Sequence, residues 1–257
     1  TLEELEQFDL ERAFAIYQER FADTSDFTFV FVGSFEEEQI KSLAQIYLGN
    51  LPAGDRVESW SDVRPDPPTG QIEEIVYKGQ DEQSRSFLLF TGRIDPTPEN
   101  RLRLQLLRGV LDLRLTDDLR EELGGTYSPG VVASVAPEPD QSYGFYVTFG
   151  SDPKRVDELL AATWADIAEV KAEGPQADEF AKVVEQARRT HERELRENAY
   201  WLETLTDYAE NPDEPIDSAL SFEETLANIQ PADLQSAAQE HLREEDHIKV
   251  VQLPEAD

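Results

Sequence analysis

The sequence has 257 residues, 39% of them hydrophobic, and this length and composition fit a folded protein with a sizeable core. Its 55 acidic and 23 basic residues give a net charge of −32, which argues against nucleic acid as a partner because both surfaces would be negative. No apolar run approaches the roughly 20 residues of a membrane-spanning helix, so membrane insertion is not expected. The sequence has no cysteine, which excludes disulfides and thiolate metal sites.

The first part of the chain, residues 1–57, is predicted to form a helix, a strand and a second helix. Apolar positions recur at helical spacing through residues 2–21. The aromatic and β-branched run Phe27–Val32, FTFVFV, is typical of a strand, and a helix is predicted from Glu36 to Leu48. The stretch that follows holds several Pro, Asp and Gly residues and is interpreted as a linker, bounded here as 58–71.

Residues 72–257 form a denser series of predicted elements. Strands are predicted at Ile72–Tyr77, Arg85–Thr91, Thr126–Val135, Tyr143–Phe149 and His247–Leu253, with a hairpin around Pro137–Gln141. Helices are predicted at Pro98–Leu123, Lys154–Ala172, Gln176–Tyr208, Ser221–Asn228 and Pro231–Leu242. Gly124-Gly125 marks the end of the first of these helices.

Two segments far apart in the chain have the same predicted layout. Leu10–Val32 and Pro231–Leu253 each run from a helix through a short polar loop into a strand. This similarity suggests that residues 1–57 are the tail of a preceding, similar domain. Helix–loop–strand units are common, however, and the layout alone leaves that alternative open.

The acidic residues are spread along the whole chain and do not form one block. Lysine is scarce, and arginine supplies most of the positive charge. One interpretation is adaptation to high salt, where ionic strength screens the self-repulsion. The other is an acidic surface that binds cationic ligands. The even spread favours salt adaptation and predicts that added salt stabilises the protein.

The three histidines do not form a recognisable metal motif. Two histidines four residues apart on a helix can bind one zinc ion, but the position four residues after His191 is Leu195. We therefore expect His191 to be an exposed helix residue. His241 and His247 lie among acidic residues near the end, where nothing in the sequence orders them.

No nucleophilic motif is present either. The sequence has no cysteine and no Gly-x-Ser-x-Gly elbow, and Ser128 has no neighbouring histidine to activate it. Gly124-Gly125 follows a helix and lacks a lysine, unlike a phosphate loop. From spacing alone, Arg120 is explained by the helix C-terminus that it occupies, and Tyr127 by ordinary packing.

Several runs resemble the pitrilysin/insulinase-type (M16) zinc metallopeptidases. FTFVFVGSFEEEQIKSLAQIYLGNLP, which starts at Phe27, resembles the strand and helix that open the C-terminal repeat of that family. Leu119–Gly130, LREELGGTYSPG, is a more specific match, because it places Arg120 and Tyr127 seven residues apart as in the family. YGFYVTFGSDPKRVDELLAATWADIAEVKAEGP and RELRENAYWLETL also match in order, so the resemblance covers nearly the whole chain.

The resemblance implies an α+β fold of the pitrilysin/LuxS-like metallohydrolase type, with a mixed, mostly antiparallel sheet and helices packed on one face. It implies that residues 72–257 are the C-terminal, non-catalytic domain of a longer protein. Zinc is expected in the parent enzyme on a His-x-x-Glu-His motif outside this chain, and no catalytic or metal-binding residue is expected within it. Arg120 and Tyr127 are the implied substrate-binding residues.

The resemblance also implies the partners. They are a peptide substrate and the zinc-bearing half of the same polypeptide or a partner subunit, with this chain forming chamber wall. Two alternatives stay open: a non-catalytic pitrilysin-like partner or scaffold subunit, and an acidic module that binds cationic peptides. The sequence does not distinguish a bacterial cytoplasmic from a periplasmic location.

Overall fold

The computed structural model describes residues 2–55, 59, 61, 63, 68–126, 129–136, 141–211 and 220–255. The chain divides into two compact units. The first contains Thr1–Val63 and Glu197–Glu210, and the second contains Arg64–Arg196 and Asn211–Asp257. Within these described ranges, no helix is both long enough and apolar enough to cross a bilayer.

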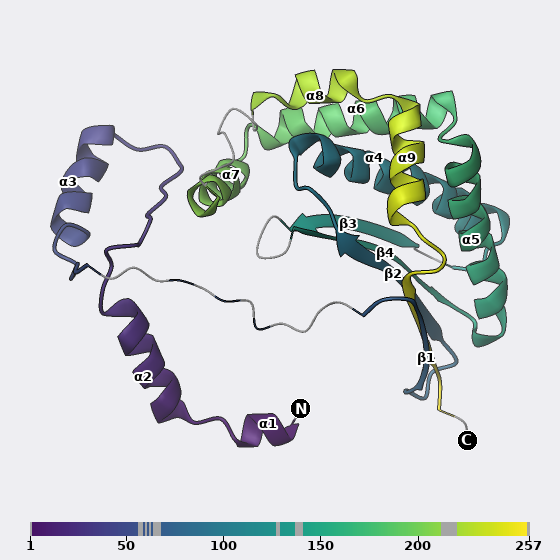
Figure 1. Ribbon diagram of the computed structural model, residues 1–257, viewed down its shortest axis with the longest axis horizontal. Coiled ribbons are helices and arrows are strands. Elements are labelled where there is room, and N and C mark those ends of the chain that lie inside the picture. Colours follow the sequence, from purple (N-terminus) through teal and green to yellow (C-terminus); the bar gives the residue numbers. More distant parts are fainter. Residues whose placement is uncertain are drawn as a thin grey trace. The chain divides into compact units, whose positions relative to one another are not determined.

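A five-stranded sheet forms one layer of the second unit in the described residues (Figure 1). Its strands are β1 (Gln71–Tyr77), β2 (Ser84–Arg93), β3 (Gly130–Ala136), β4 (Ser142–Ser151) and β5 (His247–Leu253). The strand order is β1-β5-β2-β4-β3. Only the β1–β5 pair is parallel among these ladders, so the sheet is mixed and mostly antiparallel, as predicted.

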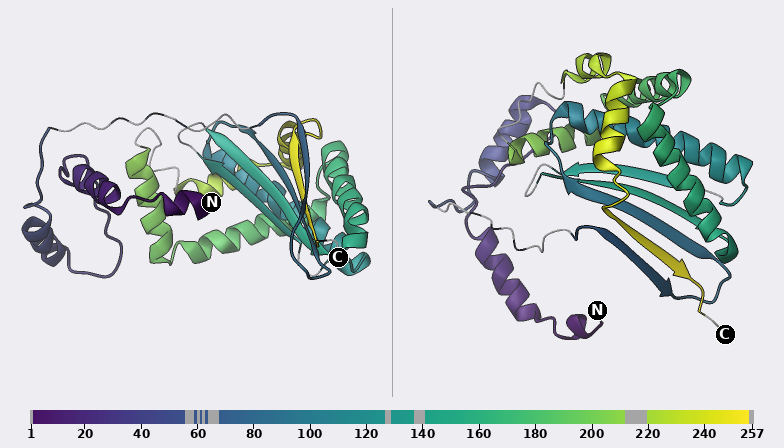
Figure 2. Two further views of the ribbon diagram at one scale, coloured as in Figure 1. Left: turned by 90° about the horizontal axis from the view of Figure 1, so that it is seen from below. Right: turned by 45° about the vertical axis from the view of Figure 1, so that its right-hand side comes forward.

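The helices of the second unit lie on one face of this sheet (Figures 1 and 2). They are α4 (Pro98–Leu115), the π-helix η1 (Thr116–Glu122), the short 3-10 helix η2 (Pro153–Arg155), α5 (Val156–Glu173), α6 (Ala177–Glu194), α8 (Phe222–Asn228) and α9 (Pro231–His241). The predicted α+β class with helices on one face is therefore confirmed. The hairpin of β3 and β4 is confirmed too, although residues 137–140 at its turn lie outside the described residues.

Alternation of side chains along β4 explains why the sheet has one covered face. Tyr143, Phe145, Val147 and Phe149 are all buried, whereas Tyr146 between them is 43% exposed. Successive side chains of a strand point to opposite faces, so the aromatic and β-branched set faces the helices.

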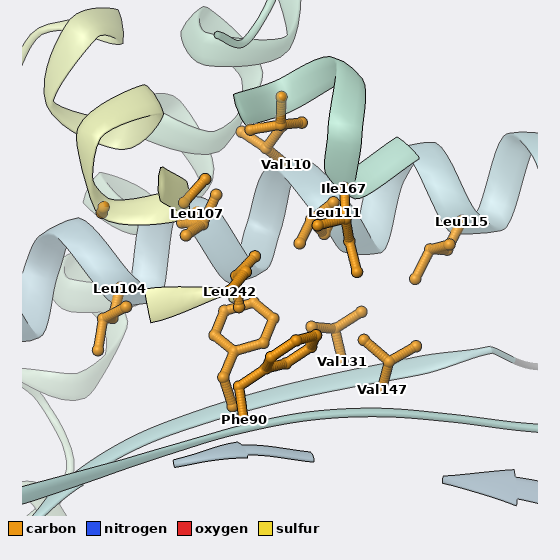
Figure 3. Packing of buried hydrophobic residues seen from close by; sticks show 14 of the residues in the cluster. Phe90, Leu104, Leu107, Val110, Leu111, Leu115, Val131, Val147, Ile167 and Leu242 are labelled. Atoms are coloured by element: carbon orange, nitrogen blue, oxygen red, sulfur yellow. The ribbon is translucent and has the colours of Figure 1, made fainter. Parts of the chain in front are cut away.

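The core lies between α4 and the sheet (Figure 3). Leu104 and Leu115 project from α4 toward the sheet, where Phe90 on β2 and Val147 on β4 belong to the same buried cluster. Each of these side chains is at most 1% exposed. Burying a side chain of this size contributes roughly 1.5–3 kcal/mol, so this contact stabilises the packing of α4 on the sheet.

The first unit consists of α1 (Leu2–Glu6), α2 (Leu10–Phe21), α3 (Glu37–Tyr47), α7 (Asn198–Glu210) and the segments between them. The single helix predicted over residues 2–21 is wrong, because Asp9 begins a new helix. Its carboxylate accepts a hydrogen bond from the backbone N–H of Arg12 at 2.9 Å, which is an N-cap.

The predicted strand Phe27–Val32 is also wrong, because none of these residues is in a strand. A strand exists only when its backbone pairs with another strand, and this segment has no such partner among the described residues. Phe29 and Phe31 are 45% and 50% exposed. By contrast, the similar run His247–Leu253 forms β5 because β1 and β2 flank it.

The long helix predicted over 176–208 is two helices, α6 and α7. The break at residues 195–197 coincides with the passage from the second unit to the first. The two helices therefore pack in different units. The sequence does not indicate this break, because residues 195–197 include neither Gly nor Pro. Half of the predicted linker 58–71 lies outside the described residues, and β1 begins at its last position, Gln71.

Candidate functional site

Arg120 lies in the π-helix η1, which continues α4. Its side chain is half exposed, and its Nε atom lies 3.3 Å from Oε1 of Glu121. The backbone N–H of Leu123 donates to the carbonyl of Asp118, the five-residue spacing of a π turn. Arg120 is therefore accessible, on an irregular helical turn of the kind that often occurs at functional sites.

Tyr127 lies outside the described residues, so the structure does not test its position relative to Arg120. The segment between them is defined as far as Thr126. Gly124 ends η1 with a φ of +55°, which confirms its predicted role as a helix stop. A Cβ atom on Gly125 would lie 2.5 Å from Cδ2 of Leu159, so any larger residue here would have to displace the loop or the Leu159 side chain.

An open groove of about 620 Å³ borders this segment. Its lining residues come from the turn before β2, the loop after η1 and the end of β4: Glu82, Gln83, Gly124, Gly125, Thr126, Gly150, Ser151 and Asp152. Ser84 and Ser151 join β2 to β4 beside it through a buried hydroxyl–hydroxyl hydrogen bond of 2.9 Å. Glycine backbone and the polar side chains of Glu82, Gln83 and Asp152 contribute to this lining, so the groove offers groups that can form hydrogen bonds with a polar ligand.

The three histidines are all buried, so the expectation of an exposed His191 is wrong. His191 stacks on Phe222 with ring centroids 4.0 Å apart. His247 is also ordered, through a 2.7 Å contact of Nδ1 with the carbonyl of Glu244. Burial lowers the pKa of His241, which lies against Tyr143. These rings pack within the helix layer or against the sheet, and each is surrounded by different residues.

The described residues do not fit a zinc ion. No group of three or more His, Asp or Glu side chains in this part of the chain is arranged to hold a metal. Three protein ligands are the minimum of a catalytic zinc site.

A buried charge cluster lies beside η1, and sequence analysis missed it. Arg114 on α4 donates to both carboxylate oxygens of Glu179 on α6, and its Nη1 lies 3.2 Å from Glu169 on α5. Asp166 on α5 is only 5% exposed and interacts with Asp118 of η1. The sequence carried a signal, because Asp166 stands among apolar positions of a helix whose buried residues recur every three or four positions.

Comparison with protein families matches residues 7–187 to the peptidase M16 inactive domain. This stretch is well over half of the chain. The chain belongs to the M16 peptidase family and carries its inactive domain. The family resemblance predicted from the sequence is confirmed.

M16 relatives are similar over most of this chain. The zinc protease PQQL-like protein of Arabidopsis thaliana is 26% identical over 218 residues, which are 79% of this chain and 23% of that protein. The solved structure of the periplasmic protease PqqL from Escherichia coli matches with a TM-score of 0.71 and 19% identity, over 87% of this chain and 25% of that one. A peptidase M16 inactive domain from Pseudomonas fluorescens matches with a TM-score of 0.68 and 18% identity, over 86% and 52%. The chain thus spans about a quarter of the length of the curated relatives.

Proposed function

We propose that this chain holds peptide substrate for hydrolysis at a zinc site located elsewhere in a longer M16 parent protein. The observation that carries the proposal is the accessible Arg120, one turn before a Gly-Gly loop that lines an open polar groove. Its setting in an M16 inactive domain supports a role in binding and not in bond cleavage.

The proposed chemistry follows from the two side chains. The guanidinium of Arg120 and the phenol of Tyr127 can both donate hydrogen bonds to a peptide carbonyl. Such donors hold the substrate and stabilise the negative charge that develops on the carbonyl oxygen during hydrolysis. Zinc, bound by residues of the parent outside this chain, would supply the activated water.

We further propose that residues 1–57 belong to a preceding domain, residues 58–71 link it to the next, and residues 72–257 form the C-terminal domain. The helices α2 and α3 support this division, because neither contains a buried residue, whereas α7 of the same compact unit belongs to residues 72–257. Phe29 and Phe31 expose aromatic surface on an extended segment without a strand partner among the described residues. Such a segment fits the edge of a sheet supplied by the rest of the parent.

Variants of the full-length parent test the substrate-holding role. Tyr127→Phe and Arg120→Gln should each lower peptide kcat/KM by about 100-fold or more, the typical effect of removing one such donor. Zinc content should stay unchanged in both. Tyr208→Phe and Arg188→Gln are matched controls, because Arg188 pairs with Glu223 on the helix layer and Tyr208 lies in the first unit.

Two outcomes would oppose the proposal. Unaltered turnover in both variants would reject the role of Arg120 and Tyr127. A parent that binds no zinc and cleaves no peptide would favour the scaffold alternative.

A further inference from the structure

The strand β3 forms one edge of the sheet in the described residues, with β4 as its neighbour. Its seven residues, GVVASVA, include no charged residue and no proline, in a chain of which 30% is charged. Its ladder with β4 runs without a bulge over all seven residues. Natural proteins usually protect a sheet edge with charges, proline or a bulge, so β3 lacks the features that prevent another strand from pairing with it.

The opposite edge of the same sheet is different. β1 has the sequence QIEEIVY, with Glu73 and Glu74 in its centre. Glu73 pairs with Lys249 of β5 at 2.8 Å. A strand that approached β1 would meet these charges, whereas β3 presents none.

A side chain of α4 shows which backbone groups of β3 face outward. Nε of Arg108 donates to the carbonyl of Val131 at 2.8 Å, so that carbonyl points away from β4. In an antiparallel ladder, residues that bond the neighbouring strand alternate with residues whose N–H and C=O both point away from it. Ala133 and Val135 therefore present their N–H and C=O groups at the edge, and no hydrogen bond from another described residue reaches them. Arg108 occupies the edge at Val131 but leaves these four groups available.

A small cavity of about 210 Å³ lies on the helix side of this edge. Its lining comes from α4 and β3: Arg101, Leu104, Gln105, Ala133, Ser134 and Val135. An additional strand beside β3 would direct every second side chain to this side of the sheet. Leu104, Ala133 and Val135 contribute apolar groups to the lining, so the cavity suits an apolar side chain of modest size.

Charge distinguishes the possible partners of this edge. A second copy of the chain would bring another net charge of −32, so repulsion opposes self-pairing through β3. The same repulsion opposes an acidic peptide. A neutral or cationic peptide in extended conformation meets no such barrier, and its backbone offers the alternating donors and acceptors that the edge requires.

The edge also lies close to the groove described above. Gly150, which lines the groove, follows Thr148, the β4 partner of Gly130, so the groove lies beyond the Gly130 end of β3. An extended chain rises about 3.3 Å per residue, which places Ala133 only about 10 Å along the strand from Gly130. One extended peptide of about eight residues can therefore reach both places.

We propose that β3 binds an extended, non-acidic peptide as an additional strand, which bonds Ala133 and Val135 and places one apolar side chain in the cavity under α4. The backbone bonds supply affinity without sequence preference, and the cavity supplies a preference at one position. That this peptide is the substrate of the parent enzyme rests on the proposed function, whereas the strand pairing does not.

Amide hydrogen exchange of the 257-residue chain tests the pairing residue by residue. The probe is a peptide of about eight residues in which valine alternates with serine, with a lysine at each end and both termini blocked. At about 0.5 M NaCl, which screens non-specific attraction to the acidic surface, saturating probe should slow exchange of the Ala133 and Val135 amides about tenfold or more. The Val132 and Ser134 amides, which bond β4, are the control within the same strand and should change little.

Backbone methylation of the probe supplies a second test on the wild-type protein. N-methylation of a residue whose N–H faces β3 removes one hydrogen bond and should raise the Kd about tenfold or more. Methylation of the residues between should change it little. Equal effects at all positions, or equal protection of all four amides of β3, would overturn the proposal.

Ala133→Pro removes one outward N–H and leaves the ladder with β4 intact, which a sheet edge tolerates. It should raise the Kd of the probe about tenfold. Phe87→Ser is the matched control, because Phe87 is 39% exposed on the central strand β2, on the sheet face away from the helices. Equal weakening by both variants would indicate adsorption to that face and overturn the proposal. The methylated probes decide if Ala133→Pro does not fold.

Protection of Ala133 and Val135 without probe would also overturn the proposal. A protection that rises with protein concentration would assign the edge to a second copy, and one that does not would assign it to another segment of the chain. In the parent, an active Arg120→Gln variant together with a raised KM in Ala133→Pro would reject the role of Arg120 alone. Loss of activity in Arg120→Gln with an unchanged KM in Ala133→Pro would reject the strand pairing alone.

Discussion

The guanidinium of Arg114 binds the carboxylate of Glu179 through two hydrogen bonds, 2.8 and 2.9 Å long, inside the helix layer. Only 8% of the Arg114 side chain and 17% of the Glu179 side chain are exposed. The same carboxylate accepts the backbone N–H of Gln176 at 2.6 Å and so caps α6. One side chain thus joins α4 to the first turn of α6, near the buried Asp166 of α5.

Removing this carboxylate is expected to destabilise the second unit strongly. Glu179→Gln leaves Arg114 buried without its main counter-ion, which typically costs about 3–5 kcal/mol. The free energy of unfolding from urea titration at pH 7 measures the effect. Glu185→Gln is the matched control on α6, because its pairs with Arg188 and Arg189 are exposed and should contribute less than about 1 kcal/mol. Equal effects of the two variants would contradict the buried pair's role.

The pH dependence of stability should change when the buried Asp166 is altered. The raised pKa of Asp166 means that the folded wild type binds a proton that the unfolded chain has already lost between about pH 4 and 7. Asp166→Asn removes that linkage. Relative to the wild type it should gain about 3 kcal/mol between pH 5 and 8, because each of the two pH units from 5 to the folded pKa of about 7 contributes about 1.4 kcal/mol. Unfolding curves at several pH values give this difference directly, and parallel curves for the two proteins would refute it.

A side chain at Gly125 is expected to lower the free energy of unfolding. A Cβ atom there would lie 2.5 Å from Cδ2 of the buried Leu159, so Gly125→Ala must displace the loop or repack α5, at a cost of about 1–3 kcal/mol. Gly130→Ala is the control, because its nearest neighbour would be Thr148 Cγ2 at an ordinary 3.6 Å. Thermal unfolding distinguishes the two, and equal midpoints would show that the loop has room to move.

Added salt is expected to stabilise the chain, because 55 acidic residues face 23 basic ones. The screening length shortens from about 10 Å at 0.1 M to about 3 Å at 1 M, which weakens repulsion between surface carboxylates. The unfolding temperature should therefore rise between 0.1 and 2 M KCl, a salt chosen because chloride is a weaker general stabiliser than sulfate. A flat response would exclude salt adaptation as the reason for the acidity.

Several helices and strands of the second unit could be predicted because the sequence patterns that indicate them span only a few residues. Alternation in β4, the Gly124 stop and the Asp152 carboxylate that accepts the Lys154 N–H are all visible within a few residues. The strand predicted at Phe27–Val32 was wrong because strand formation depends on a distant partner. Its composition is typical of a strand, but pairing depends on a neighbour that no local pattern supplies.

The charge cluster was missed because its members are distant in sequence. Arg114, Asp166 and Glu179 come from three helices, and only packing brings them together. In a chain with 55 acidic residues, the sequence does not indicate which carboxylates are buried. His191 was missed for the same reason. Its acidic neighbours in the sequence suggested an exposed position, whereas Phe222 from α8 stacks on its ring.

The most direct test of the central claim is a peptide-cleavage assay on the purified 257-residue chain with added zinc. The account predicts no metal-dependent turnover, because the chain matches the M16 inactive domain and its proposed role is to hold substrate. Cleavage that needs zinc and stops with a chelator would contradict it.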